Sequence, residues 1–255
     1  MSGYTRYASL EGRPVYITGG GSGIGAAFVR AFLSNGARVS FCDIDASASA
    51  ALADALAREG LEKPHFDVLD LRDIDALKRS IAAAEARAGA IRVLVNNAAR
   101  DEREALDAIT PESWDDSYAV NLRHQFFAAQ AVRTGMAAAG GGAIINLSSN
   151  NATLGARNFA HYASAKGAVL ALTRSLAREM GEENIRVNSI IPGWVMTERQ
   201  IAKWLTPEAE RQLMRDQCLK RRLSPNDVAN LALFLASDDA AMITKQEFVV
   251  DGGWS

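Results

Sequence analysis

The sequence predicts an α/β domain in which helices cover both faces of an open, mostly parallel, doubly wound sheet of seven strands. Short apolar segments rich in β-branched residues alternate with longer segments of helical periodicity along all 255 residues. No linker, low-complexity tract or internal repeat interrupts this alternation. Residues 1–255 are therefore expected to form one domain, and 255 residues suffice for a large buried core.

The first half supplies four expected strands and three expected helices. The first helix carries its apolar side chains on one face, and Gly36 is a typical helix terminator directly after it. The next helix is rich in alanine, and the fourth strand ends in paired asparagines. In chain order, the expected elements are strand 13–18, helix 23–35, strand 38–43, helix 46–60, strand 65–68, helix 71–88 and strand 91–98.

The second half continues the pattern and contains one long exception. Pro111 begins a long helix that glycines end near 140, and Pro225 lies in the first turn of another helix. The expected elements are helix 111–138, strand 143–149, helix 161–181, strand 186–192, helix 225–237 and strand 246–250. The segment 193–222 is too long for an ordinary connection, so we expect it to form a lid over a substrate site.

Composition excludes several classes of protein. With 28 Lys+Arg against 30 Asp+Glu, the chain lacks the basic surface of a nucleic-acid-binding protein. No apolar run has the length of a membrane span, and residues 1–10 lack the apolar region of a signal peptide, so a cytoplasmic protein is expected. Cys42 and Cys218 suit no metal spacing. We expect both to be buried, apolar-like residues rather than a disulfide, and we expect no metal site.

A glycine-rich turn follows the first strand and opens directly into a helix. Its sequence is Thr18-Gly-Gly-Gly-Ser-Gly-Ile-Gly25. Glycines let a backbone turn sharply and approach a ligand closely, and the N–H groups and dipole at a helix start favour a pyrophosphate. The strand–turn–helix–strand context makes this more specific than a lone glycine-rich loop.

Asp43 ends the second strand at the position of an acid that binds an adenosine ribose. It lies 18 residues after Gly25, close to the spacing of about 20 in dinucleotide-binding units. A carboxylate there would repel the 2′-phosphate of NADP, so the sequence favours NAD. The alternative is that Asp43 only begins a turn with Asp45.

Tyr162 and Lys166 stand one helical turn apart, on the same helix face. Such a pair is common on surface helices. Facing a nicotinamide, however, a cation would lower the phenol's usual pKa of about 10 and make the tyrosine a usable base. Ser149 lies 13 residues upstream, at a strand end where it can hold a substrate oxygen, and Ser148 is its competitor.

These motifs, in this order, resemble the short-chain dehydrogenase/reductase family over essentially the whole chain, which implies a Rossmann-type fold. Ala99 departs from the family pattern, which has glycine after Asn-Asn-Ala. The resemblance implies that Tyr162 is the general acid/base, that Lys166 holds the nicotinamide ribose and depresses the tyrosine's pKa, and that Ser149 orients the reacting oxygen. Asn121 would hold a water that links Lys166 to solvent. The cofactor-binding residues expected from the motifs are Gly19, Gly21, Ser22, Gly23, Ile24, Gly25, Asp43, Asp67, Val68, Asn97, Ala98, Tyr162, Lys166, Pro192, Gly193, Val195 and Thr197.

The substrate follows from less specific features. The C-terminal half resembles bacterial sugar 1-dehydrogenases of this family, which implies hydride transfer from C1 of a cyclic pentose, hexose or 6-deoxyhexose to NAD, giving a lactone. Polar side chains near the expected substrate side fit a ligand with many hydroxyls. The expected substrate contacts are Ser149, Asn151, His161, Trp194 and Gln200.

Other functions stay open at this point. They are oxidation of another secondary alcohol on a sugar-derived acid, 3-oxoacyl reduction, or a non-catalytic nucleotide-sensing protein on the same fold. By analogy with the family we expect a homo-oligomer, a tetramer built from the helices that begin near Pro111 and His161. The particular sugar, its anomer and the pathway do not follow from the sequence.

Overall fold

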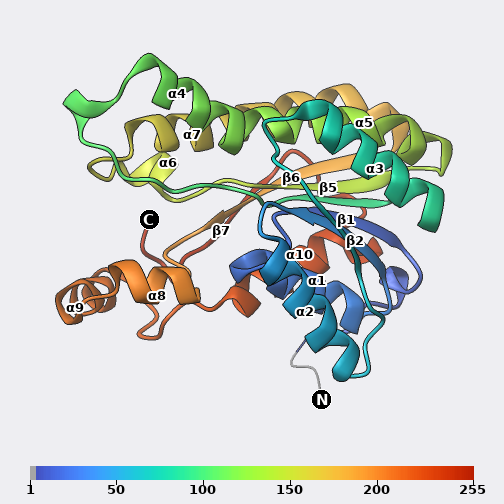
Figure 1. Cartoon of the computed structure of the whole chain (residues 1–255), viewed down its shortest axis with the longest axis horizontal. Helices are drawn as coiled ribbons and strands as arrows, with labels where there is room; N and C mark the ends of the chain where they lie inside the picture. Colours follow the sequence, from blue (N-terminus) through green and yellow to red (C-terminus); the bar gives the residue numbers. More distant parts are fainter. Residues whose placement is uncertain (1–3) are drawn as a thin grey trace.

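The computed structural model describes residues 4–255, and a parallel sheet forms its centre (Figure 1). Within those residues the sheet has seven strands in the order β3-β2-β1-β4-β5-β6-β7, and every neighbouring pair is parallel. The order reverses between β1 and β4, which is where open α/β sheets form a ligand crevice at their carboxyl ends. The strands are β1 (Pro14–Thr18), β2 (Arg38–Asp43), β3 (His65–Val68), β4 (Val93–Asn96), β5 (Gly142–Leu147), β6 (Ile185–Pro192) and β7 (Glu247–Val250).

Helices lie on both faces of the sheet. In Figure 1, α1, α2 and α10 cover one face, α3, α5 and α7 cover the other, and α8 and α9 project beyond the sheet. The α-helices are α1 (Gly23–Ser34), α2 (Ala46–Arg58), α3 (Ile74–Ala88), α4 (Pro111–Tyr118), α5 (His124–Ala138), α6 (Asn151–Leu154), α7 (Ala160–Met180), α8 (Glu198–Trp204), α9 (Pro207–Asp216) and α10 (Pro225–Ala236). Short helical turns are η1 (Ala8–Leu10), η2 (Leu106–Ala108), η3 (Ala119–Arg123), η4 (Gly181–Glu183) and η5 (Asp238–Ala240).

Alternation along the strands divides the apolar core into two clusters, one on each face. In β1, Val15 and Ile17 pack with the α1 and α10 side chains, whereas Tyr16 packs with those of α3 and α5. In β4, Val95 joins the first cluster and Leu94 the second. Because successive strand residues point to opposite faces, a sheet covered on both sides reads as a continuous apolar run. This confirms the predicted fold class.

Two regions differ from the simplest expectation. The helix predicted over 111–138 is divided by η3, a turn of π-helix, into α4 and α5. A π-turn inserts an extra residue into the hydrogen-bond ladder and is frequent at functional sites, but apolar periodicity does not reveal it. The segment 193–222 holds α8 and α9, and the side chains of Thr197 and Thr206 cap their first turns.

The two cysteines are both free, but they differ in exposure. Cys42 is buried in β2 as expected, whereas Cys218 is exposed, so its predicted burial is wrong. The backbone explains the placement, because the Cys218 N–H donates to the Gly253 carbonyl at 3.2 Å and the turn is held without burying the thiol.

No helix within residues 4–255 is long and apolar enough to cross a membrane. The same range holds no group of three or more His, Cys, Asp or Glu side chains arranged to bind a metal ion.

Candidate active site

A cleft of about 1300 Å³ opens at the carboxyl ends of the central strands. The glycine-rich turn and the first turn of α1 line one end. The catalytic candidates Ser149, Tyr162 and Lys166 line the other end, together with residues of α8. The fold therefore brings motifs that are far apart in the sequence into one cavity, at the reversal of strand order.

The glycine-rich turn is packed so closely that side chains would not fit. A Cβ on Gly25 would lie 1.8 Å from the carbonyl oxygen of Gly19, and one on Gly21 would lie 2.8 Å from Ser49 Oγ. Gly19 itself has a φ of +66°. These contacts keep backbone N–H groups bare at the start of α1, where the helix dipole favours a phosphate. The turn fits the pyrophosphate of a dinucleotide.

Asp43 supports this turn and also borders the cavity. Its Oδ2 accepts the Gly21 N–H at 2.8 Å, and its Oδ1 accepts the Asp45 N–H at 3.0 Å. The turn with Asp45 therefore exists, but it does not exhaust the carboxylate, which has about four lone-pair sites. Asp43 lines the cleft and retains acceptor capacity there.

Asn97 joins the end of β4 to the glycine-rich turn. Its side-chain Nδ2 donates to the carbonyls of Thr18 and Gly19, at 3.1 and 2.8 Å. The Thr18 hydroxyl in turn accepts the backbone N–H groups of Asn97 and Ala98. The amide of Asn97 is thus committed to holding the turn, although Asn97, Ala98 and Ala99 all line the cleft.

Tyr162 and Lys166 project from one face of α7 into the cleft, as the spacing predicted. Both are buried, with 7% and 1% of their surfaces exposed. The Lys166 ammonium donates to the Leu147 carbonyl at 2.7 Å, and its Nζ lies 5.9 Å from the centroid of the Tyr162 ring. The β5 strand end therefore anchors the lysine beside the phenol.

The two neighbouring serines have different surroundings. The Ser148 hydroxyl donates to the Lys166 backbone carbonyl at 2.7 Å and is thereby used in packing β5 against α7. Ser149 Oγ accepts only a long bond, 3.2 Å, from the Asn151 N–H. Its hydroxyl faces the Tyr162 phenol, whose pKa it lowers, so Ser149, unlike Ser148, is placed at the reaction centre.

Burial controls the ionisation of the pair. Burial raises the pKa of Tyr162 above its usual value; the Ser149 hydroxyl and the Arg199 charge lower it, and Asp101 raises it. Burial lowers the pKa of Lys166 to about 7, with Asp101 acting in the opposite direction. The expected depression of the tyrosine pKa by Lys166 is therefore not present in this structure, because desolvation outweighs it and the lysine is turned to Leu147.

Asn121 lies behind the cleft, not on its wall. It is fully buried in η3, where its Oδ1 accepts the Arg100 N–H at 2.9 Å and its Nδ2 donates to the Ser117 carbonyl at 3.0 Å. The Asn121 carbonyl accepts a bond from Gln125, whose amide also reaches the Leu147 carbonyl at 3.4 Å. Asn121 is thus linked to Lys166 through Gln125 and Leu147.

Other predicted residues divide between the cleft wall and positions away from it. Among the predicted substrate contacts, His161 is buried away from the cavity, with its Nε2 3.2 Å from Glu104 Oε2. Asp67 faces α3 and accepts the Ser80 hydroxyl at 2.6 Å, and Val68 is exposed outside the cleft. The predicted residues that do line the cleft are Gly19, Gly21, Ser22, Gly23, Ile24, Gly25, Asp43, Asn97, Ala98, Ser149, Asn151, Tyr162, Lys166, Pro192, Gly193, Trp194, Val195, Thr197 and Gln200.

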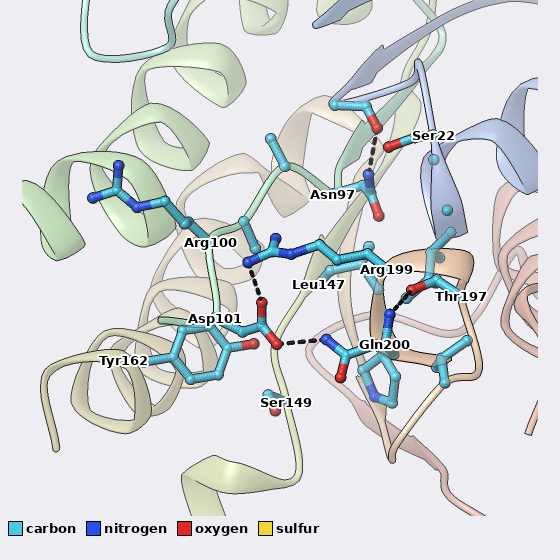
Figure 2. Close-up of a pocket in the computed structure, with 18 of the residues that line it drawn as sticks. Ser22, Asn97, Arg100, Asp101, Leu147, Ser149, Tyr162, Thr197, Arg199 and Gln200 are labelled. Atoms are coloured by element: carbon cyan, nitrogen blue, oxygen red, sulfur yellow. Dashed lines mark hydrogen bonds and ion pairs between the residues drawn. The ribbon is translucent and has the colours of Figure 1, made fainter. Parts of the chain in front are cut away.

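Asp101 is a residue of the site that sequence reasoning missed. It stands in the loop after β4, lines the cleft and bonds to Arg199 and Gln200 of α8 (Figure 2). Its position in the sequence, four residues after Asn97, could have indicated this role, because acids just beyond a strand end face the ligand crevice of a parallel sheet.

The comparisons with known proteins agree with this geometry. The family model described as enoyl-(acyl carrier protein) reductase matches residues 19–255. A probable galactose dehydrogenase of Rhizobium meliloti is 49% identical over 249 residues, covering 98% of this chain and 97% of the relative. A D-xylose 1-dehydrogenase of Caulobacter vibrioides is 46% identical, covering 97% of this chain and 98% of the relative.

Solved structures have the same fold. A 7α-hydroxysteroid dehydrogenase, solved with NADH and 7-oxo glycochenodeoxycholic acid, superimposes with a TM-score of 0.92 at 32% identity, covering 97% of this chain and 96% of that one. The nicotinamide-binding cleft, the Tyr–Lys pair and these matches lead to one conclusion. The chain belongs to the short-chain dehydrogenase/reductase family and is an oxidoreductase that acts on CH–OH groups.

Proposed function

We propose that the enzyme oxidises the anomeric C1 of a cyclic aldose to a lactone, with NAD as the hydride acceptor. The observation that carries the reaction type is the convergence of Ser149, Tyr162 and Lys166 in a cleft that also contains a nucleotide-binding turn. The substrate class is supported by a relative named a probable galactose dehydrogenase, at 49% identity, and by one named a D-xylose 1-dehydrogenase, at 46% identity.

The chain's own residues supply the proton chemistry. Ser149 would donate its hydroxyl to the substrate oxygen and hold that oxygen near the phenol. Tyr162 would take the proton from the C1 hydroxyl while the C1–H bond electrons leave, so that C1 and its oxygen form the lactone carbonyl. Lys166 would hold the ribose of the cofactor and stabilise the phenolate that begins the cycle. A bound oxidised nicotinamide would accept the hydride and bring a positive charge to this end of the cleft.

The electrostatics of the adenosine end favour NAD over NADP. Asp43, Asp45 and Asp70 line that end, and a 2′-phosphate would meet these negative charges. Arg72 is also there, but it is bonded to Asp70 and Asp116 and so is already neutralised. NAD, which carries a hydroxyl at this position, can donate to the remaining acceptor sites of Asp43.

We also propose three properties that concern the whole protein. The segment 193–222 acts as a lid at the substrate end of the single domain. The chain assembles into a homotetramer through α7 and the helical segment formed by α4 and α5. The exposed rings of Trp114 on α4 and Phe126 on α5 belong to this segment. The protein acts in the cytoplasm. Light scattering of the purified protein measures the mass of the assembly, and a monomeric mass would refute the tetramer.

A substrate panel tests the function. Aldoses, polyols, hydroxy acids and 3-oxoacyl thioesters are offered with NAD or NADP(H), and the nicotinamide absorbance is followed. We expect aldose oxidation with NAD, and lactone as the product. Turnover of a hydroxy acid with no turnover of any aldose would refute the sugar assignment.

The same assay tests the mechanism. Tyr162→Phe removes only the phenol oxygen, so turnover should be abolished while NAD affinity, measured by calorimetry, stays nearly intact. A Tyr162→Phe rate close to wild type would remove the tyrosine from the mechanism. Turnover of no compound in the panel would instead favour a nucleotide-sensing role.

A further inference from the structure

Asp101 connects two segments at the substrate end of the cleft. Its Oδ1 lies 3.1 Å from Arg199 Nη2, and its Oδ2 accepts the Gln200 Nε2 amide at 2.6 Å. Asp101 belongs to the loop after β4, whereas both partners belong to α8. The carboxylate therefore closes a polar bridge across the cleft mouth (Figure 2).

The orientation of Gln200 in this bridge is fixed by a third residue. The Trp194 indole N–H donates to Gln200 Oε1 at 2.8 Å. An indole nitrogen is a donor only, so the amide oxygen must face Trp194 and the amide nitrogen must face Asp101. Asp101 is thus an acceptor at the centre of an ordered network of hydrogen bonds.

Asp101 also faces the reaction centre. In Figure 2 its carboxylate points toward the Tyr162 phenol. Its negative charge raises the pKa of both Tyr162 and Lys166, which shows that its field reaches the catalytic pair. About a quarter of its side chain, 24%, is exposed in the cavity. Two partners leave about two of the four acceptor sites of a carboxylate unused.

We propose that Asp101 is the residue that selects neutral sugars: its carboxylate accepts hydroxyls of the aldose ring and rejects substrates that carry a carboxylate or phosphate. Hydrogen bonds from hydroxyls to an ionised acceptor are short and strong, and adjacent ring hydroxyls can meet the two oxygens together. The proposal rests on the aldose function given above and names the side chain that selects this class of substrate.

The rejection of anionic substrates depends on the charges around Asp101. Arg199 has Asp101 as its ion-pair partner, and Arg100 is bonded to Asp116. While Asp101 is ionised, the Arg199 guanidinium is neutralised. Arg103 and Arg157 also line the cleft, and Arg103 stacks on the Trp204 ring, 3.8 Å from its centroid. Loss of the Asp101 charge would leave the Arg199 guanidinium, which is 45% exposed, ready to pair with an anionic substrate.

The experiment compares a neutral sugar with its acidic counterpart. Wild type, Asp101→Asn and Arg199→Gln are assayed with NAD on D-galactose, D-xylose and D-galacturonate, and kcat and KM are determined separately. Glu102→Gln is the matched control, because it removes one charge from the same loop and its side chain lies outside the cleft. NADH affinity, measured by fluorescence, reports whether the cleft is intact in each variant.

For Asp101→Asn we expect kcat/KM on the neutral sugar to fall by about 10- to 100-fold, mainly through KM, as for loss of a charge-assisted hydrogen bond. The ratio of galacturonate to galactose turnover should rise by at least about tenfold. Arg199→Gln should keep the preference for the neutral sugar, because the Asp101 carboxylate is still present.

Two results would overturn the proposal. One is an unchanged ratio of galacturonate to galactose in Asp101→Asn with normal NADH binding. The other is an equal loss in Asp101→Asn and Arg199→Gln, which would reduce Asp101 to a clamp for α8. Failure of the aldose function is separate, since it would appear as an inactive wild type on every sugar.

Discussion

Lys166 is predicted to destabilise the ligand-free fold, and Lys166→Met should show this directly. The side chain is 1% exposed, and burial lowers the pKa of Lys166 from 10.5 to about 7. Each unit of pKa difference between the folded and unfolded chain is worth about 1.36 kcal/mol. Holding this lysine in the fold therefore costs on the order of 4 kcal/mol at pH 7.

The sign of the pH dependence follows from the protons bound. Between the folded pKa of about 7 and the unfolded value of 10.5, the unfolded chain binds more protons at Lys166 than the folded chain. Wild-type stability therefore rises with pH through this window. Lys166→Met has no such group, so its advantage over wild type should shrink by about 2 kcal/mol between pH 7 and pH 9.

The net gain of Lys166→Met at pH 7 is smaller than the full cost. Methionine cannot donate to the Leu147 carbonyl, and the lost hydrogen bond offsets about 1 kcal/mol. We therefore expect Lys166→Met to be more stable than wild type by about 2–4 kcal/mol at pH 7, and inactive.

Urea unfolding of the ligand-free protein at pH 7 and pH 9 measures both quantities, at one protomer concentration so that any assembly contributes equally. Lys63→Met is the control, because Lys63 forms an exposed ion pair with Asp54, and such pairs contribute little. A Lys166→Met variant no more stable than wild type at pH 7, or a difference equal at the two pH values, would refute the reasoning.

Three further predictions concern the cofactor turn and the fold. Gly25→Ala would place its Cβ 1.8 Å from the Gly19 carbonyl oxygen, so the turn must shift; NAD affinity by calorimetry should fall at least tenfold, and normal affinity would contradict the packing. Asp43→Asn keeps an acceptor but loses the charge, so the ratio of NAD to NADP kcat/KM should fall about tenfold; an unchanged ratio would count against the role of that charge. Asp227→Asn weakens the capping box with Ser224 at the start of α10 and should cost about 1 kcal/mol in urea unfolding at pH 7. The Arg221 guanidinium and the Ser224 N–H and hydroxyl lower the pKa of Asp227 in the fold, so the contribution of its charge is present above pH 3.8 and is lost as pH falls; equal differences at pH 7 and pH 3 would contradict a stabilising role for that charge.

The sequence predicted the parts of the site that are built locally. The glycine-rich turn and the Tyr162–Lys166 pair each lie within one element, so their spacing alone carries the geometry. The central strands were found for a similar reason, because β1, β4 and β5 are largely apolar, buried runs in a sheet covered on both faces. The position of Ser149 could be predicted because it lies just after the end of β5, at the sheet edge where the start of α7 also lies.

The remaining features depend on contacts between distant segments. Asp101 meets Arg199 across 98 positions of chain, and no periodicity relates them. The commitment of Ser148 to the Lys166 carbonyl also becomes visible only when β5 and α7 are packed together. Conversely, Asp67 matches a family motif, but its side chain faces α3. There its carboxylate accepts a hydrogen bond from the Ser80 hydroxyl.

The helix that carries Arg199 and Gln200 packs only loosely against the rest of the molecule. No side chain of α8 is fully buried, and α9 buries only Leu213, so neither helix contributes to the two apolar clusters. Detaching α8 would therefore break a few polar bonds and leave the folded interior untouched. Amide hydrogens in α8 should then exchange by local opening, at a rate that changes little when the whole protein is made more stable. Access to the cleft and thermal robustness can consequently vary independently in this chain.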